Sequence, residues 1–355
     1  MGTAHRLLFP FSEMAKALNS VIGLDLGRHS LKSVVMQRRG PDRISVSNYA
    51  IRKLPETMES ADQLGSEIKA LFKEMGGSSK PCAIAISSPE TILRIIEQPD
   101  TPTSLLREAF RLNSMTLLNQ DCREYVLDCD KISVSNPEEL PQGRFRYLVG
   151  GLPRTQVKEM NLALESAGVN ILGLQLAPVS LFNAFEAAQG EMFANHGFFL
   201  VDIGYSNTTM LLGAKKELVL VRTVDAGGKS ILETLTALSG ETAESVLIAL
   251  DQEDDFMIEN ARVAISNLTR EIGSSIGFFE GRREETIGQV FLSGGIAKSR
   301  TLVKVMGEEL HMNCLSWSAL EHCEPALGGA QRDKFEEDSL DLHVACGAAV
   351  EMLNS

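Results

Sequence analysis

The 355-residue sequence has no apolar run long enough to span a membrane and no signal-peptide core near its N-terminus. It also has little to attract nucleic acid, because its formal net charge is -13 at pH 7. Its six cysteines are scattered without a C-x-x-C pair, which indicates reduced thiols and argues against a disulfide framework or a zinc site. These absences predict a cytoplasmic protein.

What the chain does have is the composition of an ordinary globular protein, with 44% hydrophobic and 23% charged residues. Strand-like and helix-like segments alternate from residue 21 onward, which predicts an α/β protein. Residues 1–20 mix apolar and polar side chains around Pro10, so we expect a flexible tail, with a short membrane-touching or packing helix as the alternative. The polar stretch "GGAQRDKFEEDSLD" is expected to be a surface loop.

A strand–Asp–x–Gly–turn–strand pattern occurs twice. "VIGLDLGRHSLKSVVM" carries Asp25 and Gly27, and "FFLVDIGYSNTTMLLG" carries Asp202 and Gly204, 177 residues further on. One such pattern is explained by a hairpin, but two at half the chain length predict two similar halves. Glycine lets backbone amides approach an anion, so the two turns could hold a polyphosphate from both sides, with each Asp reaching Mg²⁺ through water.

Two double-glycine corners accompany these hairpins. In "QVFLSGGIAKSR" a buried strand ends at Gly294 and Gly295, where backbone could lie against a flat ring. In "VRTVDAGGKSILETL" Gly227 and Gly228 stand between a strand and a helix. Each corner alone is more often a turn than a site, but all four elements occur in an order that favours a nucleotide site.

This order resembles the actin-like ATPase superfamily. Within it, "GLDLGRHSLKSVVM", "LVDIGYSNTTMLLGAKKELVLVRTVDAGG" and the segment from "EYVLDCDKI" to "LGLQL" are most similar to the PilM family of type IV pilus and type II secretion assembly. The resemblance implies two RNase H-like lobes and a terminal hinge helix, "HVACGAAVEML", in which Ala345, Gly347 and Ala348 allow a close crossing between the lobes. The implied division is a first lobe at 21–91 with 169–190 and 341–355, an inserted α/β subdomain at 92–168, and a second lobe at 191–340 whose residues 229–285 are mostly helical.

The resemblance also implies ATP and Mg²⁺ as cofactors, with Asp25 and Asp202 as the metal-facing acids. Read from the residues alone, His29 could be an exposed turn residue, and Arg28 and Lys32 could be solvated charges beside the strand. The residues implied to bind the nucleotide are Asp25, Gly27, Arg28, His29, Ser30, Lys32, Asp202, Gly204, Ser206, Asn207, Thr208, Gly227, Gly228, Glu244, Gly294, Gly295 and Lys298.

The sequence departs from the superfamily pattern at two positions. Ala177 stands before Pro178, where related ATPases have an acid or amide that orients the attacking water. Gln175 could substitute, but slow or absent hydrolysis is the expectation. Glu244 is present, whereas Leu247 replaces the lysine that usually touches the ribose, so nucleotide binding is expected to be weaker than usual.

The family resemblance implies an ATP-binding scaffold that captures the cytoplasmic N-terminal peptide of a PilN-like protein with one membrane span. Such a scaffold would lie beside the inner membrane through its partners. The insert at 92–168 would provide the groove, with free strand edges for an extended peptide. Two alternatives stay open: a small-molecule kinase of the same superfamily, and an FtsA-like filament that tethers to the membrane.

Overall fold

The computed structural model describes residues 9–10, 18–41, 43–58, 60–77, 80–136, 138, 140–252, 255–283 and 285–354. The chain divides into two compact units. Unit 1 comprises Met1–Ala188, Ala319–Phe335 and Leu342–Ser355, and unit 2 comprises Gln189–Ser318 and Glu336–Asp341. Most of the expected tail at 1–20 lies outside the described residues.

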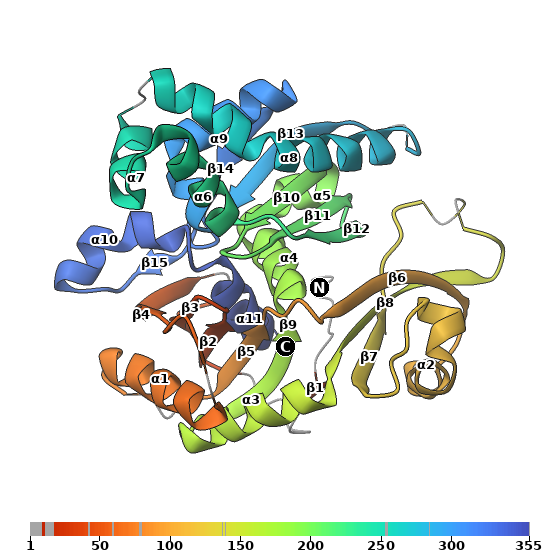
Figure 1. The fold of residues 1–355 in the computed structure, drawn as a ribbon. Coiled ribbons are helices and arrows are strands. Elements are labelled where there is room, and N and C mark those ends of the chain that lie inside the picture. The colour runs from red at the N-terminus through yellow and green to blue at the C-terminus, as the bar shows by residue number, and fades with distance from the viewer. Residues whose placement is uncertain are drawn as a thin grey trace. The chain divides into compact units, whose positions relative to one another are not determined.

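A seven-stranded sheet forms the centre of unit 1 (Figure 1). In order across the sheet its strands are β1 (Phe9–Pro10), β9 (Ile171–Leu176), β5 (Cys82–Ile86), β2 (Ser20–Leu26), β3 (Ser30–Arg38), β4 (Ile44–Lys53) and β15 (Glu324–Pro325). The strands β2, β3 and β4 pair antiparallel, whereas β5 runs parallel to both β2 and β9. β2 and β5 are almost completely buried, as expected for central strands covered on both faces.

Several helices of unit 1 pack on this sheet or on one another, and two contacts of α11 require glycine. These helices are α1 (Ala61–Glu74), α3 (Arg154–Ser166), α4 (Ala177–Ala188) and α11 (His343–Asn354). A Cβ at Gly347 would lie 1.7 Å from the Ser180 carbonyl oxygen of α4, and one at Gly23 of β2 would lie 1.8 Å from the Ala345 oxygen of α11. The terminal helix therefore does make a close crossing, but against α4 and β2 of its own unit, whereas a crossing between the lobes is the expectation from the resemblance.

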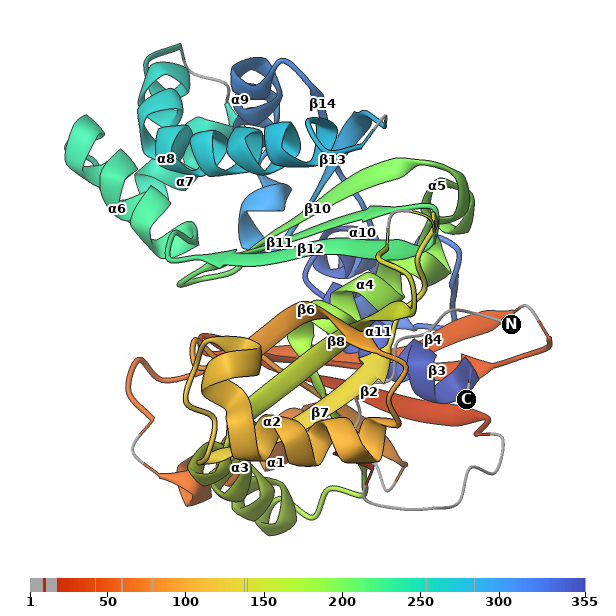
Figure 2. The same cartoon turned by 90° about the vertical axis from the view of Figure 1, so that its right-hand side faces the viewer.

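The segment inserted between β5 and β9 has its own sheet and core. Its strands β6 (Ile92–Pro99), β8 (Arg144–Pro153) and β7 (Tyr125–Lys131) lie in that order and pair antiparallel. Helix α2 (Thr103–Leu118) covers one face of this sheet through Leu106, Phe110 and Leu118 (Figure 2). These elements lie within residues 92–168, where the resemblance implies an inserted α/β subdomain.

A five-stranded sheet forms the centre of unit 2. Its strands in order are β12 (Glu217–Val224), β11 (Thr208–Ala214), β10 (Gly197–Ile203), β13 (Ile287–Ser293) and β14 (Asn313–Ser316). The helices are α5 (Gly190–Asn195), α6 (Gly228–Ser239), α7 (Ala243–Asp251), α8 (Asp255–Glu280) and α9 (Arg300–Leu310), with the short 3₁₀ helix η2 at Gly295–Lys298. The sheet and helices α6–α9 share one hydrophobic core.

The two units repeat one strand arrangement. In unit 1 the order β4-β3-β2-β5-β9 has two antiparallel pairs followed by two parallel pairs, and β12-β11-β10-β13-β14 in unit 2 has the same order and the same directions. Asp25 and Asp202 occupy equivalent positions, next to the last residue of the first strand of each repeat. The internal repeat predicted from two short motifs is thereby confirmed.

Two expectations were wrong. The stretch expected to be a surface loop contains helix α10 (Gly329–Ser339), which is rich in helix-forming Ala, Gln, Lys and Glu but has no apolar stripe. Residues 319–335 belong to unit 1 and not to the second half, because β15 pairs with β4 and the Phe335 ring lies 5.8 Å from the Tyr49 ring. Among the described helices, none is long and apolar enough to cross a bilayer.

Candidate functional site

The first predicted phosphate turn connects β2 to β3 in unit 1. Asp25 is buried near the end of β2, and its strand register places it opposite Lys32, so the two side chains lie on the same face of the sheet. Gly27 begins the turn, where an added Cβ would lie 2.6 Å from the carbonyl oxygen of Ser30. Glycine is therefore required here by close backbone approach. Arg28 is exposed, and Ser30 is partly buried at the start of β3.

The second turn, between β10 and β11 in unit 2, has the same construction. A Cβ on Gly204 would lie 3.0 Å from the carbonyl oxygen of Asn207, again three residues further along. Ser206 is exposed, Asn207 is partly buried, and Thr208 starts β11 fully buried. The matching contact in both turns shows that the repeat extends from the strands to the local backbone of the predicted phosphate loops.

Both double-glycine corners of unit 2 pack against this second turn. A Cβ on Gly227 would lie within 2.6–2.7 Å of backbone atoms of Gly204, Tyr205 and Asn207, and the Gly228 amide donates to the Gly204 carbonyl at 2.8 Å. Gly294 has a φ of +85°, and its Cβ would lie 2.2 Å from the Ile203 oxygen. Three segments far apart in the sequence thus meet at one corner, and only glycine fits at the contacts.

Polar groups hold this corner in place. The Ser293 hydroxyl donates to Asp202 Oδ1 at 2.8 Å, which ties the end of β13 to the end of β10. The Thr208 hydroxyl donates to the Ala226 carbonyl at 2.6 Å and fixes the loop that leads to Gly227. Ser293 was not among the predicted site residues. Its position directly before a double glycine, at the end of a predicted buried strand, could have indicated that Ser293 belongs to the site.

Three predicted residues stand apart from these contacts. Glu244 is exposed on the first turn of α7, and Leu247 on the next turn is 51% exposed. Lys298, at the end of η2, forms an ion pair with Asp341 at 2.6 Å. For Gly295 no heavy atom lies within 4 Å of an added Cβ, so a side chain would fit there. The nucleotide-binding roles given to these residues stay predictions.

Gln175 lies in the interior of unit 1 and is 1% exposed. Its amide nitrogen donates to Glu351 of α11, and its amide oxygen accepts from Ser180 of α4. Asn183 donates to the same Glu351 carboxylate at 2.8 Å. Both ends of the Gln175 amide are therefore used inside the protein, and nothing in these contacts supports the catalytic role considered for it. Sequence reasoning missed this buried network because Gln175 and Glu351 are 176 residues apart.

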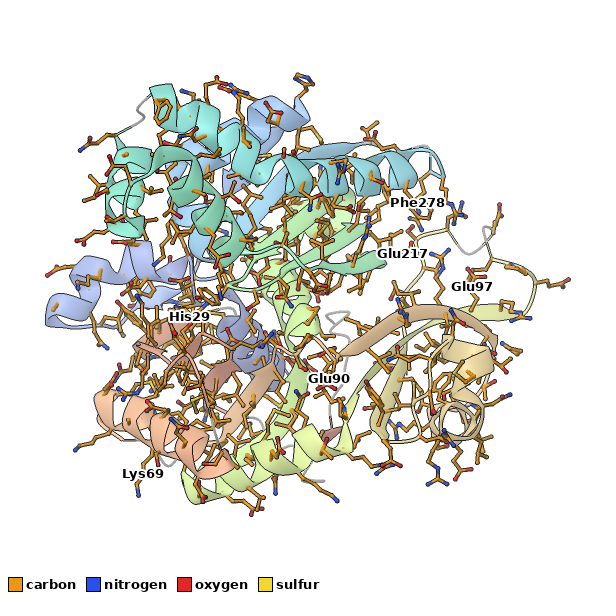
Figure 3. All side chains as sticks on the ribbon, in the orientation of Figure 1. His29, Lys69, Glu90, Glu97, Glu217 and Phe278 are labelled. Carbon is orange, nitrogen blue, oxygen red and sulfur yellow. The ribbon has the colours of Figure 1, made fainter. Side chains whose placement is uncertain are left out.

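His29, which is labelled in Figure 3, is partly buried in the first turn. Burial lowers the pKa of its imidazole below the ordinary value of 6.5, and Lys53 and Lys32 lower the pKa further, against a smaller opposing effect of Glu56. The two lysines disfavour the protonated form of His29, and a bound anion in the turn would favour it. This electrostatic environment is consistent with an anion-binding turn.

The described residues contain no group of three or more His, Cys, Asp or Glu side chains that could hold a metal ion. Asp25 and Asp202 each stand beside a glycine turn and offer carboxylate oxygens, the ligand type that Mg²⁺ prefers. The assignment of Mg²⁺ to these two residues stays a prediction.

A family model described as type IV pilus assembly protein PilM matches residues 23–353. The chain belongs to the PilM family. The match includes both hairpins, the insert and α11 of this PilM-family protein. A comparison with curated proteins gave no match.

Solved structures place this PilM-family chain in the actin-like ATPase fold. A structure described as a PilM-PilN type IV pilus biogenesis complex matches with a TM-score of 0.79 and 23% identity, over 95% of this chain and 99% of the other. The ethanolamine utilization protein EutJ from Carboxydothermus hydrogenoformans matches with a TM-score of 0.55 and 13% identity, over 98% and 92% of the two chains. At these identities the likeness shows the fold.

Proposed function

We propose that this PilM-family protein is an ATP-binding scaffold of a pilus or secretion assembly that holds the N-terminal peptide of a PilN-like membrane protein. The observation that carries the nucleotide part is the corner of unit 2, where the Gly204 turn, Gly227 and Gly294 pack together beside Asp202. Backbone amides in a turn of small residues can bind phosphate oxygens, and a carboxylate at the end of the adjacent strand can face a hydrated cation.

In this proposal the residues of the protein bind and orient the nucleotide. The glycine turns offer backbone close to the phosphates, Asp25 and Asp202 face the water ligands of Mg²⁺, and the Ser293 hydroxyl orients the Asp202 carboxylate. The cation would offset phosphate charge when bound. We predict that one ATP molecule contacts both hairpins. Variants that change only one hairpin at a time test this prediction.

The nucleotide proposal is tested by thermal unfolding with and without ATP and Mg²⁺. A ligand that binds only the native state raises its melting temperature, by an amount equivalent to about 2.7 kcal/mol at one hundred times Kd. We expect ATP to stabilise the wild type, and Asp25→Ala and Asp202→Ala each to lose that stabilisation. Glu159→Ala, which removes an exposed carboxylate on α3, is the matched control and should respond as the wild type does. An unchanged ATP response in both aspartate variants would contradict the proposal.

The partner part rests on the family and on the second face of the insert sheet. Because side chains alternate along a strand, Ile95 and its register partner Leu148 point away from the face that α2 covers. Leu148 is fully buried on that face, whereas Leu93 and Ile95 of the edge strand β6 remain partly exposed. An apolar face beside a strand edge can accept an extended peptide with apolar side chains. Membrane proximity would then come from the partner.

The partner proposal is tested by titrating the N-terminal cytoplasmic peptide of a PilN-like protein from the same genome. We expect Ile95→Asp to weaken binding by about tenfold or more, because a carboxylate in an apolar contact is costly to desolvate. Leu112→Asp is the matched control, since Leu112 is 80% exposed on α2, which covers the other face. Melting temperatures show whether either variant is misfolded. Equal weakening by both variants, or none by Ile95→Asp, would remove the insert from the proposal.

A further inference from the structure

Strand β14 lies at one end of the sheet of unit 2, and its outer edge is open among the described residues. β14 runs parallel to β13 on one side, and no described strand pairs with it on the other. In unit 1 the equivalent strand of the repeat is β9, whose outer edge pairs antiparallel with β1. The amides and carbonyls along an open strand edge are a template for another extended segment. The repeat therefore shows which kind of segment this edge accepts.

A pocket of about 430 Å³ lies between α9 and the start of β14, two elements that are adjacent in Figure 2. Its apolar lining comes from Val303 of α9, from Met312, and from Cys314 of β14. Gly307 of α9 also lines the pocket, and a Cβ there would lie 3.1 Å from the Met312 carbonyl oxygen. The missing side chain leaves room for one from another molecule. The volume lies within the usual range for ligand pockets, about 300–1,000 Å³.

The strand register directs one side chain of an added strand into this pocket. Cys314 lies on the face of the sheet that α9 covers, because its Cβ would be 3.7 Å from a Cβ at Gly307. Residues directly opposite each other in paired strands lie on the same face of the sheet. The residue opposite Cys314 would therefore point toward α9 and the pocket, and its two neighbours would point to the other face.

The size of the pocket favours a segment of a different protein over a second copy of this chain. If two copies paired antiparallel through β14, the side chain opposite Cys314 would be Cys314 or Ser316 of the second copy, since these two residues share a face. A thiol or a hydroxyl group is too small to fill the pocket, whereas a leucine, methionine or phenylalanine side chain would bury apolar surface in it.

The charges at the rim favour an acidic segment. Glu308 of α9 forms an ion pair with Arg262 of α8, and the same guanidinium binds Glu309 at 2.6 Å. The charge of Glu308 is therefore offset within the protein. Lys304 is exposed at the rim and carries a positive charge. An aspartate or glutamate on the same face of the added strand, two residues from the apolar side chain, would complement Lys304.

We propose that the β14 edge and the adjacent pocket bind an extended segment of a partner protein, which adds antiparallel to β14 and places a large apolar side chain opposite Cys314. Backbone hydrogen bonds to the edge supply affinity, and the pocket and Lys304 supply specificity. The proposal does not rest on the proposed function. The edge and the pocket lie within unit 2 and include neither the glycine turns nor any residue of the insert.

The test uses the full chain and twenty fluorescent heptapeptides, acetyl-Thr-Asp-Val-X-Val-Asp-Thr-amide, with each amino acid in turn at X. Binding is measured by fluorescence anisotropy. We expect the peptides with Leu, Met or Phe at X to bind about tenfold or more tightly than those with Gly, Asp or Lys, because only the former bury apolar surface in the pocket. Amide exchange at residues 313–316 should slow when the leucine peptide is bound.

Two N-methylated forms of the leucine peptide test strand addition directly. Each form carries methyl groups on alternate amides, so one loses the N–H groups that would face β14 and the other loses those that face away. We expect the first form to lose binding and the second to retain it. Binding of both forms with the affinity of the unmodified peptide would overturn strand addition at this edge.

Two protein variants locate the site. Val303→Asp should reduce the affinity for the leucine peptide about tenfold or more, because it places a carboxylate in the apolar lining. Val263→Asp is its matched control, since Val263 is 56% exposed on α8 and does not line the pocket. Lys304→Glu should weaken binding, by less at high salt, whereas Lys158→Glu on α3 should not. Melting temperatures show whether each variant is folded, and Lys304→Glu changes only an exposed side chain.

Equal affinity for all twenty peptides would overturn the proposal, and so would no binding by any of them up to about 1 mM. Unchanged binding to folded Val303→Asp and to Lys304→Glu would place the peptide elsewhere and would also overturn it. Sedimentation of the protein alone tests the other occupant. A dimer that is lost in Val303→Asp but kept in Val263→Asp, with slow amide exchange at residues 313–316 before any peptide is added, would assign the edge to a second copy and overturn the partner segment.

Discussion

At the scale of single residues, His29 makes the first turn sensitive to pH. Its pKa in the folded protein lies below 6.5 because of burial and of Lys53 and Lys32. The unfolded chain therefore binds more protons than the folded protein just below pH 6.5, and stability falls as pH falls through this window. An anion in the turn would raise the pKa of His29, so its binding would be accompanied by proton uptake.

We expect ATP affinity to increase as pH is lowered from 7.5 to 6, by at most about tenfold per pH unit since one proton is involved. His29→Asn should lack this part of the increase while retaining any contribution from protonation of ATP itself. Isothermal titration of both proteins at several pH values measures the difference. Identical pH profiles would show that His29 does not face the phosphates.

At the scale of secondary-structure elements, the crossing of α11 over α4 depends on one glycine. A Cβ at Gly347 would lie 1.7 Å from the Ser180 oxygen and 3.1 Å from the Ala184 nitrogen, both backbone atoms that cannot move aside separately. Gly347→Ala is expected to destabilise the protein by about 3 kcal/mol or more, measured as a loss of melting temperature.

Gly277 in α8 is the matched control for this substitution, because no heavy atom lies within 4 Å of its added Cβ. Gly277→Ala should stabilise the protein by about 0.5–1 kcal/mol, since alanine has less backbone freedom to lose in a helix. A Gly347→Ala protein as stable as the wild type would mean that the two helices can separate at little cost.

At the scale of the whole molecule, the PilM-family chain has an actin-like ATPase fold, and its resemblance to that superfamily implies that Ala177 stands where related ATPases orient the attacking water. Ala177 is 7% exposed and carries no polar group, and the neighbouring Gln175 is bonded to Ser180 and Glu351 inside unit 1. We expect ATP turnover well below about 1 s⁻¹, the low end for working enzymes. Phosphate release by the wild type measures this, and fast turnover that disappears in Asp202→Ala would contradict it.

Much of the architecture follows from local sequence. The two Asp-x-Gly hairpins, the presence of an inserted α/β segment and the small residues of α11 were all predicted. Strand alternation, helical periodicity and the steric requirement for glycine act over a few residues, so the sequence shows them directly. The spacing of the two hairpins was enough to predict the repeat, which the strand orders of the two units confirm.

Tertiary structure decided the rest, because the contacts concerned join distant residues. The sequence around Gln175 cannot show that Glu351, 176 residues away, accepts its amide, and the sequence around Phe9 cannot show that Leu174 lies opposite. α10 has no apolar stripe, so its polar sequence resembles that of a loop. In the structure its Gln331 side chain donates a hydrogen bond to Asn48 at 2.8 Å, a contact that the local sequence does not indicate. Burial and long-range hydrogen bonds determine these features, and both depend on which segments the completed fold brings together.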